Sequence, residues 1–553
     1  MNPIQKTCIE TGKSFVISVA EQEYCRENGI PLPVIHPHER LRHMLYFRNR
    51  LYLYHTKCDF SRKPILSCVP PESGQKVYDI GIWESDEWDG ADYAMEYDFT
   101  KSFFKQFAVL AKNVPWPNLA LNKSLMENSD YTNGITKAKN CYLLFSASFN
   151  EDCMFSSYLN SCNNVVDSTL VTNSEFCYEC VNVNQGYNLH FSEQCFGCSD
   201  SYFLYNCQAC SNCFGCVNLR NKEYCFYNKQ LSKEDYKKKI AGIDLGSYKV
   251  VQSELKKFRN FSKDFPIKYI FGKNIENSTG NNMFNVKNTR DSYLMQNTED
   301  MENCIWLTDA KSSFVQAMFG NNSELVYNSI TVGDNAYNIK FCNEAWPDVH
   351  DLEYCMFVTH GSGNCFGCVG LKRKQYCILN KQYSKEDYFD MVRRIKKQMM
   401  ENGEYGQFFP KSMSPNYYNE SEDNLFFPLT KEDAVKKGYR WAEEKEAPDF
   451  VPSYKVPDNI KDVKDDILET ELKCEKTGRK FKIIKQELDF YRKNNFPIPH
   501  VSPMKRLEER SGVLAVNELH DEKCSKCGVN ISTTYDAVKF RILCEKCYLK
   551  DVY

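Results

Sequence analysis

Four cysteines near the end of the chain are spaced as metal ligands. Cys524 and Cys527 form one C-x2-C pair, and Cys544 and Cys547 form a second. Two such pairs place four thiolates for one tetrahedral zinc ion, and no coordination position is then left open for a catalytic water. The pattern predicts a structural zinc site, with a redox pair or an iron site as the alternative.

The N-terminal part repeats this module in degenerate form. The segment that begins at Cys8 matches the segment that begins at Cys474, and the same offset aligns Cys58 with Cys524. The other three ligand positions of the Cys58 copy are occupied by Ser61, Asp79 and Ile82. A separate group, Cys8, His36 and His38, could hold a metal weakly, although a metal-free remnant with its own core is the favoured interpretation.

The cysteines in the middle of the chain follow a strict three-residue spacing. Between residues 141 and 228, all of them are separated by multiples of three, and most other positions on this grid carry serine, valine or leucine. A strand buries every second residue and a helix buries residues at a spacing of 3.6, so neither gives this period. A tight coil with four inward positions per turn gives a period of three residues. We therefore predict a narrow parallel β-helix with about twelve residues per turn.

One turn of this coil is filled with cysteine. Cys207, Cys210, Cys213 and Cys216 would all point inward, which could indicate a buried metal or iron–sulfur site, or disulfides. Cysteine is also small, polarizable and often buried. Because neighbouring turns carry serine, valine or leucine at the equivalent places, packing is the favoured interpretation.

The coil is duplicated within the chain. Residues 212–236 and 364–388 are identical at 18 of 25 positions, and each copy ends in a helix-capping signal, at Ser232 and Ser384. The cysteines of the second coil are not all separated by multiples of three. Extra residues inserted at corners of the coil, such as the loop at 346–350, would explain this. The predicted organisation is mainly β: a degenerate zinc-ribbon-like module at 1–95, a helical linker at 96–138, a first coil at 139–230, a helical insert at 231–276, a second coil at 277–382, a capping helix and linker at 383–470, and a zinc-ribbon module at 471–553.

Large aromatic residues follow the first grid position of successive turns and would form a stripe along the coil. A stripe this long would be an unusually large exposed patch for a monomer. It is either a stacking platform for bases or sugars, or a surface covered by the second coil or the flanking helices, and we favour the covered arrangement. The residues of the candidate stripe are Tyr178, Phe191, Tyr202, Phe203, Phe214 and Phe226.

Composition places limits on the function. The 553 residues carry a net charge of −3, so no global basic field indicates nucleic acid or membrane binding. No apolar run approaches the length of a membrane span. The short apolar run at 14–20 recurs near the other end of the chain, so we assign it to a folded module rather than a signal peptide. With 27 cysteines and no export signal, thiols and metal ligands in the cytoplasm are expected.

The two 212–236 and 364–388 segments, the C-x2-TG end modules and the WESDEWD segment at 83–89 carry a resemblance. They resemble the uncharacterised cysteine-rich, zinc-ribbon proteins that are abundant in candidate-phyla (Patescibacteria-like) bacteria. The resemblance implies no activity. Members typically carry more C-x2-C pairs, and here four other residues stand where cysteines would be expected: His36, Glu39, Ser502 and Lys505.

The sequence shows no catalytic triad order, phosphate loop or dinucleotide fingerprint, which favours a non-enzymatic protein over an enzyme. The leading hypothesis is a zinc-binding solenoid scaffold that binds a macromolecular partner, either a protein or a ribonucleoprotein. The alternatives are a nucleic-acid or ribosome-associated binding protein, for which any RNA binding would be weak, and a β-helix enzyme acting on carbohydrate. An exposed stripe beside Lys and Arg would favour nucleic acid, one beside paired carboxylates would favour carbohydrate, and a buried stripe would favour the scaffold. The oligomeric state is not predicted.

Overall fold

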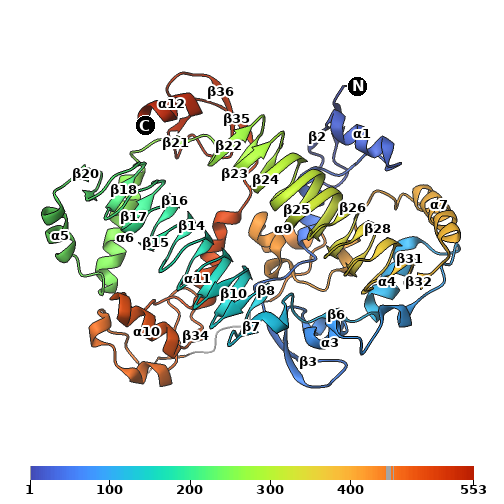
Figure 1. Cartoon of the computed structure of the whole chain (residues 1–553), viewed down its shortest axis with the longest axis horizontal. Helices are drawn as coiled ribbons and strands as arrows, with labels where there is room; N and C mark the ends of the chain where they lie inside the picture. Colours follow the sequence, from blue (N-terminus) through green and yellow to red (C-terminus); the bar gives the residue numbers. More distant parts are fainter. Residues whose placement is uncertain (1, 444–449, 453, 553) are drawn as a thin grey trace.

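The computed structural model describes residues 2–443, 450–452 and 454–552, and it is mainly β. Two coils of short parallel strands lie side by side (Figure 1). None of the described helices is long and apolar enough to cross a lipid bilayer. The main strands of the first coil are β8 (Asn133–Ile135), β10 (Tyr142–Ala147), β12 (Met154–Asn160), β13 (Thr169–Thr172), β14 (Val181–Asn184), β16 (Glu193–Phe196), β17 (Ser199–Tyr205), β18 (Phe214–Val217) and β19 (Cys225–Phe226).

The predicted twelve-residue turn is confirmed by the strand register. Val171 pairs with Val183, and Leu204 pairs with Cys216, each in parallel. The residue before each grid position adopts a left-handed conformation, with φ of 53° at Asn140 and 47° at Leu143. Each side of the coil therefore has three residues: the inward grid residue, the residue after it, and a left-handed corner residue. This repeat is the physical origin of the three-residue period.

Small side chains on the grid bond to the backbone inside the coil. Cys153 donates its thiol to the carbonyl of Glu151 at 3.3 Å, two residues earlier. Ser168 donates to Val166 at 2.9 Å and also accepts the N–H of Cys180, one turn later, at 3.1 Å. Cysteine and serine are thus small enough for the interior and also satisfy its polar backbone groups.

The cysteine-filled turn has this same structural role. Cys207 and Cys210 donate to the carbonyls of Tyr205 and Gln208, at 3.6 and 3.4 Å. All 27 cysteines of the chain are free. Within the described residues, the one group of metal-ligating side chains close enough together to hold an ion is in the C-terminal module, not in this turn. These observations support packing over a metal or disulfides.

The turns of the second coil vary in length: the first has eleven residues, since Gly272 pairs with Met283, and the last has twelve, since Gly363 pairs with Gln375. Met301 pairs with Ser313 at a spacing of twelve, but Tyr337 pairs with His350 at a spacing of thirteen. An extra residue at one corner of successive turns explains why its cysteines lose their common phase. The main strands of this coil are β22 (Gly272–Glu276), β23 (Gly280–Lys287), β24 (Ser292–Glu302), β25 (Ile305–Val332), β26 (Tyr337–Lys340), β28 (His350–Glu353), β30 (Gly363–Phe366) and β31 (Gln375–Ile378).

Two predicted boundaries need correction. Strand β7 (Met126–Glu127) and β8 already belong to the first coil, although 96–138 was expected to be a helical linker; α4 (Phe103–Asn113) is its helical part. Likewise β22 lies inside 231–276, after the two helices of that insert, α5 (Lys233–Ala241) and α6 (Tyr248–Ser262). Neither segment contains a cysteine, so the three-residue cysteine spacing could not reveal the coil there.

The end modules dock crosswise on the coils. The N-terminal module, with α1 (Val19–Glu27) and α2 (Pro37–Leu45), packs on the second coil, where Arg40 bonds to Glu21 at 2.8 Å and to Tyr327 at 3.1 Å. The C-terminal module, with α10 (Lys485–Asn494) and α11 (Pro503–Ser511), packs on the first coil. The same pair recurs there, since Arg506 bonds to Glu487 at 3.2 Å and to Asp167 at 3.0 Å. The duplication of the chain ends therefore extends to their buried contacts.

Candidate functional site

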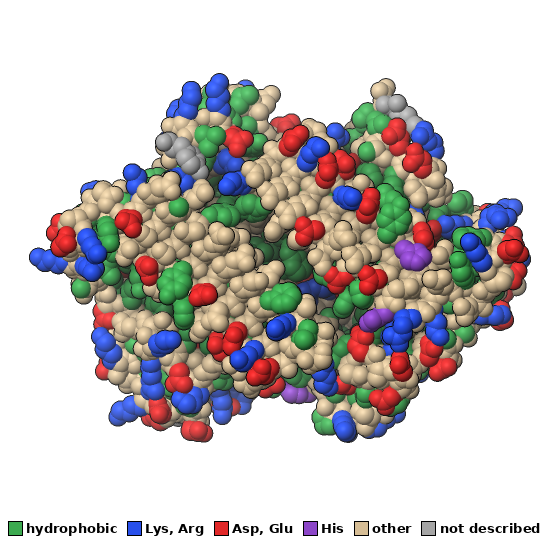
Figure 2. Space-filling view, in the orientation of Figure 1, with side chains coloured by type: hydrophobic (Ala, Val, Ile, Leu, Met, Phe, Trp, Pro, Cys, Tyr) green, Lys and Arg blue, Asp and Glu red, His purple; other side chains and the backbone are tan. Residues whose placement is uncertain are grey.

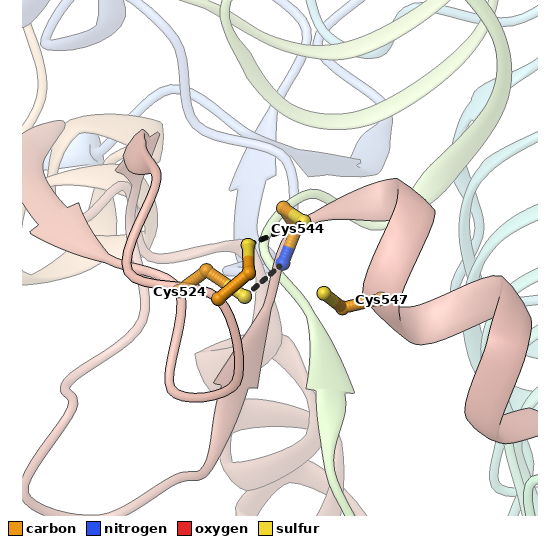
Figure 3. Close-up of side chains that lie close together, drawn as sticks. Cys524, Cys544 and Cys547 are labelled. Atoms are coloured by element: carbon orange, nitrogen blue, oxygen red, sulfur yellow. Dashed lines mark hydrogen bonds between the residues drawn. The ribbon is translucent and has the colours of Figure 1, made fainter.

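The four predicted metal ligands come from one hairpin and one helix start. Cys524 and Cys527 lie in the turn between β35 (His520–Lys523) and β36 (Asn530–Thr533), and Cys544 lies between β37 (Ile542–Leu543) and α12 (Glu545–Val552). Gly528 closes the turn with a φ of 73° and donates to the carbonyl of Cys524 at 2.9 Å. Cys547 is in the first turn of α12 and faces the hairpin, as Figure 3 shows.

The geometry of this four-cysteine site (Cys524, Cys527, Cys544 and Cys547) fits a tetrahedral metal ion. The four Sγ atoms all lie within 4.8 Å of one another, and Cys527 Sγ is 3.7 Å from Cys544 Sγ. A tetrahedron with metal–sulfur bonds of about 2.3 Å has edges of about 3.8 Å, which matches this separation. The structure therefore brings together the four residues that the sequence spacing predicted.

The electrostatics of the four-cysteine site favour a cation. Burial raises the pKa of Cys524, but backbone N–H groups of Cys544, Cys527 and Lys526 lower it to about 6. Burial and the neighbouring thiols raise the pKa of Cys547 to about 12. Without a cation, thiolates packed this closely repel one another, so a bound divalent ion would release protons from the site.

The four-cysteine site lies where the two coils meet (Figure 1). Strand β37 pairs in parallel with β21 (Ile267–Lys268), which precedes the second coil. Thr533 donates to the carbonyl of Tyr269 at 2.7 Å, and the Tyr548 hydroxyl donates to Asn218 of the first coil at 3.2 Å. The local fold around the metal ligands is therefore connected to the end of one coil and the start of the other.

Three other hairpins of the chain, which begin at Cys8, Cys58 and Cys474, repeat the backbone of the hairpin at Cys524. Cys58 and Cys474 donate their N–H groups to Lys63 and Arg479 at 2.9 and 2.8 Å, as Cys524 does to Val529 at 2.9 Å. The Sγ atoms of Cys58 and Cys474 accept backbone N–H groups at 3.3 Å, where Cys524 accepts from Cys544; the donors are Asp79 and Ser502. Asp79 and Ser502 therefore occupy the position of Cys544: they donate the same backbone N–H but supply no thiolate.

The hairpin at Cys8 belongs to the weaker metal candidates, Cys8, His36 and His38. His36 Nδ1 accepts the backbone N–H of His38 at 3.1 Å and so caps α2, while His38 Nε2 faces Asp291 at 3.4 Å. Within the described residues, these three side chains do not form a group close enough to hold one ion. The histidines act in helix capping and in docking on the second coil, roles that their spacing alone did not indicate.

The aromatic stripe is covered by the chain itself. Tyr178 stacks on Phe496 of the C-terminal module at 4.8 Å, and Phe203 contacts Phe258 of α6 at 6.1 Å. Tyr202 and Phe226 are partly buried, and the other four members have 9% or less of their surface exposed: Tyr178, Phe191, Phe203 and Phe214. A stripe buried in this way offers no stacking platform for bases or sugars.

Glu193 of the first coil is half-buried near Tyr535 of the C-terminal module. Burial raises its pKa to about 7, and Arg259 only partly offsets this effect. The unfolded chain releases this proton near pH 4.5, so the folded state binds more protons between about pH 4.5 and 7, and stability falls as pH rises through this window. Glu193→Gln should therefore stabilise the protein by about 1–3 kcal/mol at pH 8 and change little at pH 4.5. Thermal unfolding at the two pH values measures this difference, and an equal effect at both would contradict it.

No family model matches the chain, and no curated protein matches it. A solved structure from Desulfovibrio desulfuricans G20, described as an acetyltransferase, is 11% identical and aligns over 50% of this chain and 81% of its own, with a TM-score of 0.11. The UDP-N-acetylglucosamine acyltransferase from Campylobacter jejuni is 8% identical over 53% of this chain and 93% of its own, with a TM-score of 0.09. Similarities this low carry no argument about activity.

Proposed function

We propose that the protein is a non-enzymatic, cytoplasmic scaffold in which zinc occupies the four-cysteine site and a macromolecular partner is bound. The burial of the aromatic ladders carries this interpretation. In the second coil, Tyr327, Phe341 and Tyr354 are at most 1% exposed, and Phe341 and Tyr354 lie against Tyr405. Tyr327 also stacks on Tyr24 of the N-terminal module at 5.2 Å. Because the aromatic faces of both coils hold other parts of the chain, we assign the coils the role of a rigid frame.

The surface around the four-cysteine site supports a partner-binding role. Apolar side chains that are 39–95% exposed gather there: Val529, Val538, Phe540 and Leu549. Exposed apolar groups on a small unit are typical of protein-binding surfaces. A zinc ion would stabilise the hairpin, the segment after β36 and α12, which together carry these side chains, since structural zinc contributes directly to the folding of such small domains.

Replacing Val538 and Phe540 by serine should release the partner without unfolding the protein, because both side chains are exposed. Wild-type protein and the double variant would be compared in co-purification from source cells, with Val435→Ser as the control, since Val435 is 53% exposed on another surface. We expect wild-type protein and the control to retain the same partner and the double variant to lose it, at unchanged metal content. Equal recovery by all three would contradict this role.

The nucleic-acid alternative rests on basic residues of the same unit. Six of them are exposed: Lys523, Lys526, Lys539, Arg541, Lys546 and Lys550. Charges of both signs are nevertheless interspersed over the face in Figure 2, and the net charge is −3. We therefore expect no sub-micromolar affinity for an unrelated single-stranded RNA at physiological salt, because phosphate contacts dominate such binding. Measured sub-micromolar affinity would favour this alternative over the scaffold.

A further inference from the structure

The last turns of the two coils are similar in sequence but differ in their surroundings. Residues 212–236 end the first coil and enter α5, and residues 364–388 end the second coil and enter α7 (Lys385–Glu401). Residues 84–98, which lead from the hairpin at Cys58 to α4, lie against the last turn of the second coil. This acidic segment contains seven Asp and Glu residues and no Lys, Arg or His. It shows which kind of chain this surface can hold.

Ion pairs hold the acidic segment on the second coil at two points. Asp89 pairs with Lys374 at 2.7 Å, and Glu96 pairs with Lys381. The two lysines precede and follow strand β31, seven residues apart, and the two acidic residues have the same separation in their own segment. The charges of the segment are therefore matched to a lysine on each side of the last strand.

The backbone of the acidic segment is recognised as well. The side-chain amide of Asn380 donates to the carbonyl of Gly90 at 2.8 Å, and the N–H of Met95 donates to the carbonyl of Leu379 at 2.9 Å. Asn380 and Leu379 are at most 1% exposed. The second coil thus offers one donor and one acceptor, the two groups with which a polypeptide backbone pairs.

The first coil repeats this surface. The two lysines and the asparagine have counterparts of the same type at an offset of 152: Lys222, Asn228 and Lys229. The Asn228 side chain accepts the N–H of Val217 at 2.8 Å and donates to its carbonyl at 2.9 Å. Asn380 makes the same two bonds to Val369, each at 2.8 Å. The two last turns therefore have the same local geometry.

On the first coil, the described part of the chain supplies no equivalent of the acidic segment. Lys222 and Lys229 are exposed, and neither forms an ion pair within the described residues. Among these residues, no carbonyl takes the place of Gly90 at Asn228, and no backbone N–H donates to the carbonyl of Tyr227, the counterpart of Leu379. Asn228 and Tyr227 are half-buried, whereas their counterparts are buried. The groups that hold the acidic segment on one coil are thus available on the other.

The last turn of the first coil is also the more basic of the two. Residues 222–239 contain six lysines and three acidic residues, whereas residues 374–391 contain three of each. The excess comes from three exposed residues of α5: Lys237, Lys238 and Lys239. Helix α5 lies at the left end of the molecule in Figure 1, and Lys and Arg side chains are prominent at the same end in Figure 2. This charge attracts an acidic partner and speeds its encounter.

We propose that the last turn of the first coil binds an acidic segment of a protein partner, in the way that the second coil binds residues 84–98. One carboxylate of the partner pairs with Lys222 and a later one with Lys229. Between them, a backbone carbonyl accepts from Asn228 and an N–H donates to Tyr227. A nucleic-acid backbone has no N–H for the last of these bonds, so a polypeptide fits better. The site shares no residue with the apolar surface around the four-cysteine site and does not depend on its metal.

A labelled peptide with the sequence of residues 84–98 tests this site on the full-length protein by fluorescence anisotropy. The second coil already holds its own tethered copy of the segment, so the peptide is left with the first coil. We expect saturable binding of one peptide per chain. Lys222→Glu combined with Lys229→Glu should weaken it by about 10-fold or more, because two attractions become repulsions. A peptide whose acidic residues are replaced by Asn and Gln should lose as much.

The matched control is Lys105→Glu combined with Lys137→Glu, which changes the net charge equally. Both lysines are exposed, Lys105 on α4 and Lys137 near the start of the first coil. This variant should bind the peptide like wild-type protein. No saturation up to about 1 mM peptide, or equal affinity of the two double variants, would overturn the proposal. So would a single-stranded RNA of equal charge that binds the same lysines more tightly than the peptide, since the surface would then recognise phosphates.

Discussion

Val171→Phe should collapse the first coil. Val171 is fully buried in β13, between Leu159 and Val183 of the neighbouring turns. The interior at this level has room only for small side chains, and the backbone closes around it every twelve residues, so a ring cannot be accommodated by a rotamer change. We expect a loss of about 3 kcal/mol or more, at the upper end of overpacking effects. Chemical denaturation followed by circular dichroism measures it.

Phe176→Ser is the control for this substitution. Phe176 lies at a left-handed corner, with a φ of 53°, and its ring is half-buried on the outside of the coil against Tyr187. Its removal leaves the interior intact, so a loss of about 1 kcal/mol or less is expected. Similar losses for the two variants would be incompatible with a coil filled from a three-residue grid.

Arg506→Met should detach the C-terminal module from the first coil. Arg506 is 6% exposed and bonds to Asp167 and Glu487. Asp167 keeps Arg510 as a partner at 2.7 Å, but Glu487 is left without its guanidinium. Breaking such a buried pair from one side costs about 3–5 kcal/mol. Hydrogen exchange over residues 471–515 should show the loss, with Arg492→Met, at a more exposed ion pair with Asp465, as a nearly neutral control.

The loss in Arg506→Met should depend on pH. Burial raises the pKa of Glu487 to about 7, although Arg506 opposes this effect. Without the guanidinium, the folded-state pKa of Glu487 rises further, so the folded chain must either keep the proton or bury a lone charge. The variant should therefore be destabilised more at pH 8 than at pH 5. A loss that is independent of pH would assign the effect to packing alone.

The interior of the first coil could be predicted because its constraint is local. A left-handed corner every third residue places one side chain in three inside, and the spacing of Cys153, Cys177 and Cys213 records this directly. The four-cysteine site could be predicted for the same reason, since both pairs of ligands lie within short turns. In each case the pattern follows from backbone geometry over a few residues.

What covers the coils could not be predicted. The stripe that contains Tyr178 and Phe203 is equally compatible with exposure and burial until its neighbours are known, and those neighbours come from Phe258 and Phe496, distant in sequence. The crosswise docking depends in the same way on long-range contacts. The duplicated ends do contain one indication of this docking. Glu21 and Arg40 recur as Glu487 and Arg506, at the offset that relates Cys8 to Cys474.

The metal content of the purified protein is the most direct test of the scaffold with a structural zinc site. Protein expressed without added metal should contain about one zinc per chain, and Cys524→Ser should contain none. In that variant, the hairpin and α12 should lose their protection from hydrogen exchange while the coils stay folded, because the four-cysteine site is closed and structural. Absence of zinc from the wild-type protein, iron in its place, or zinc retained by Cys524→Ser would contradict the assignment.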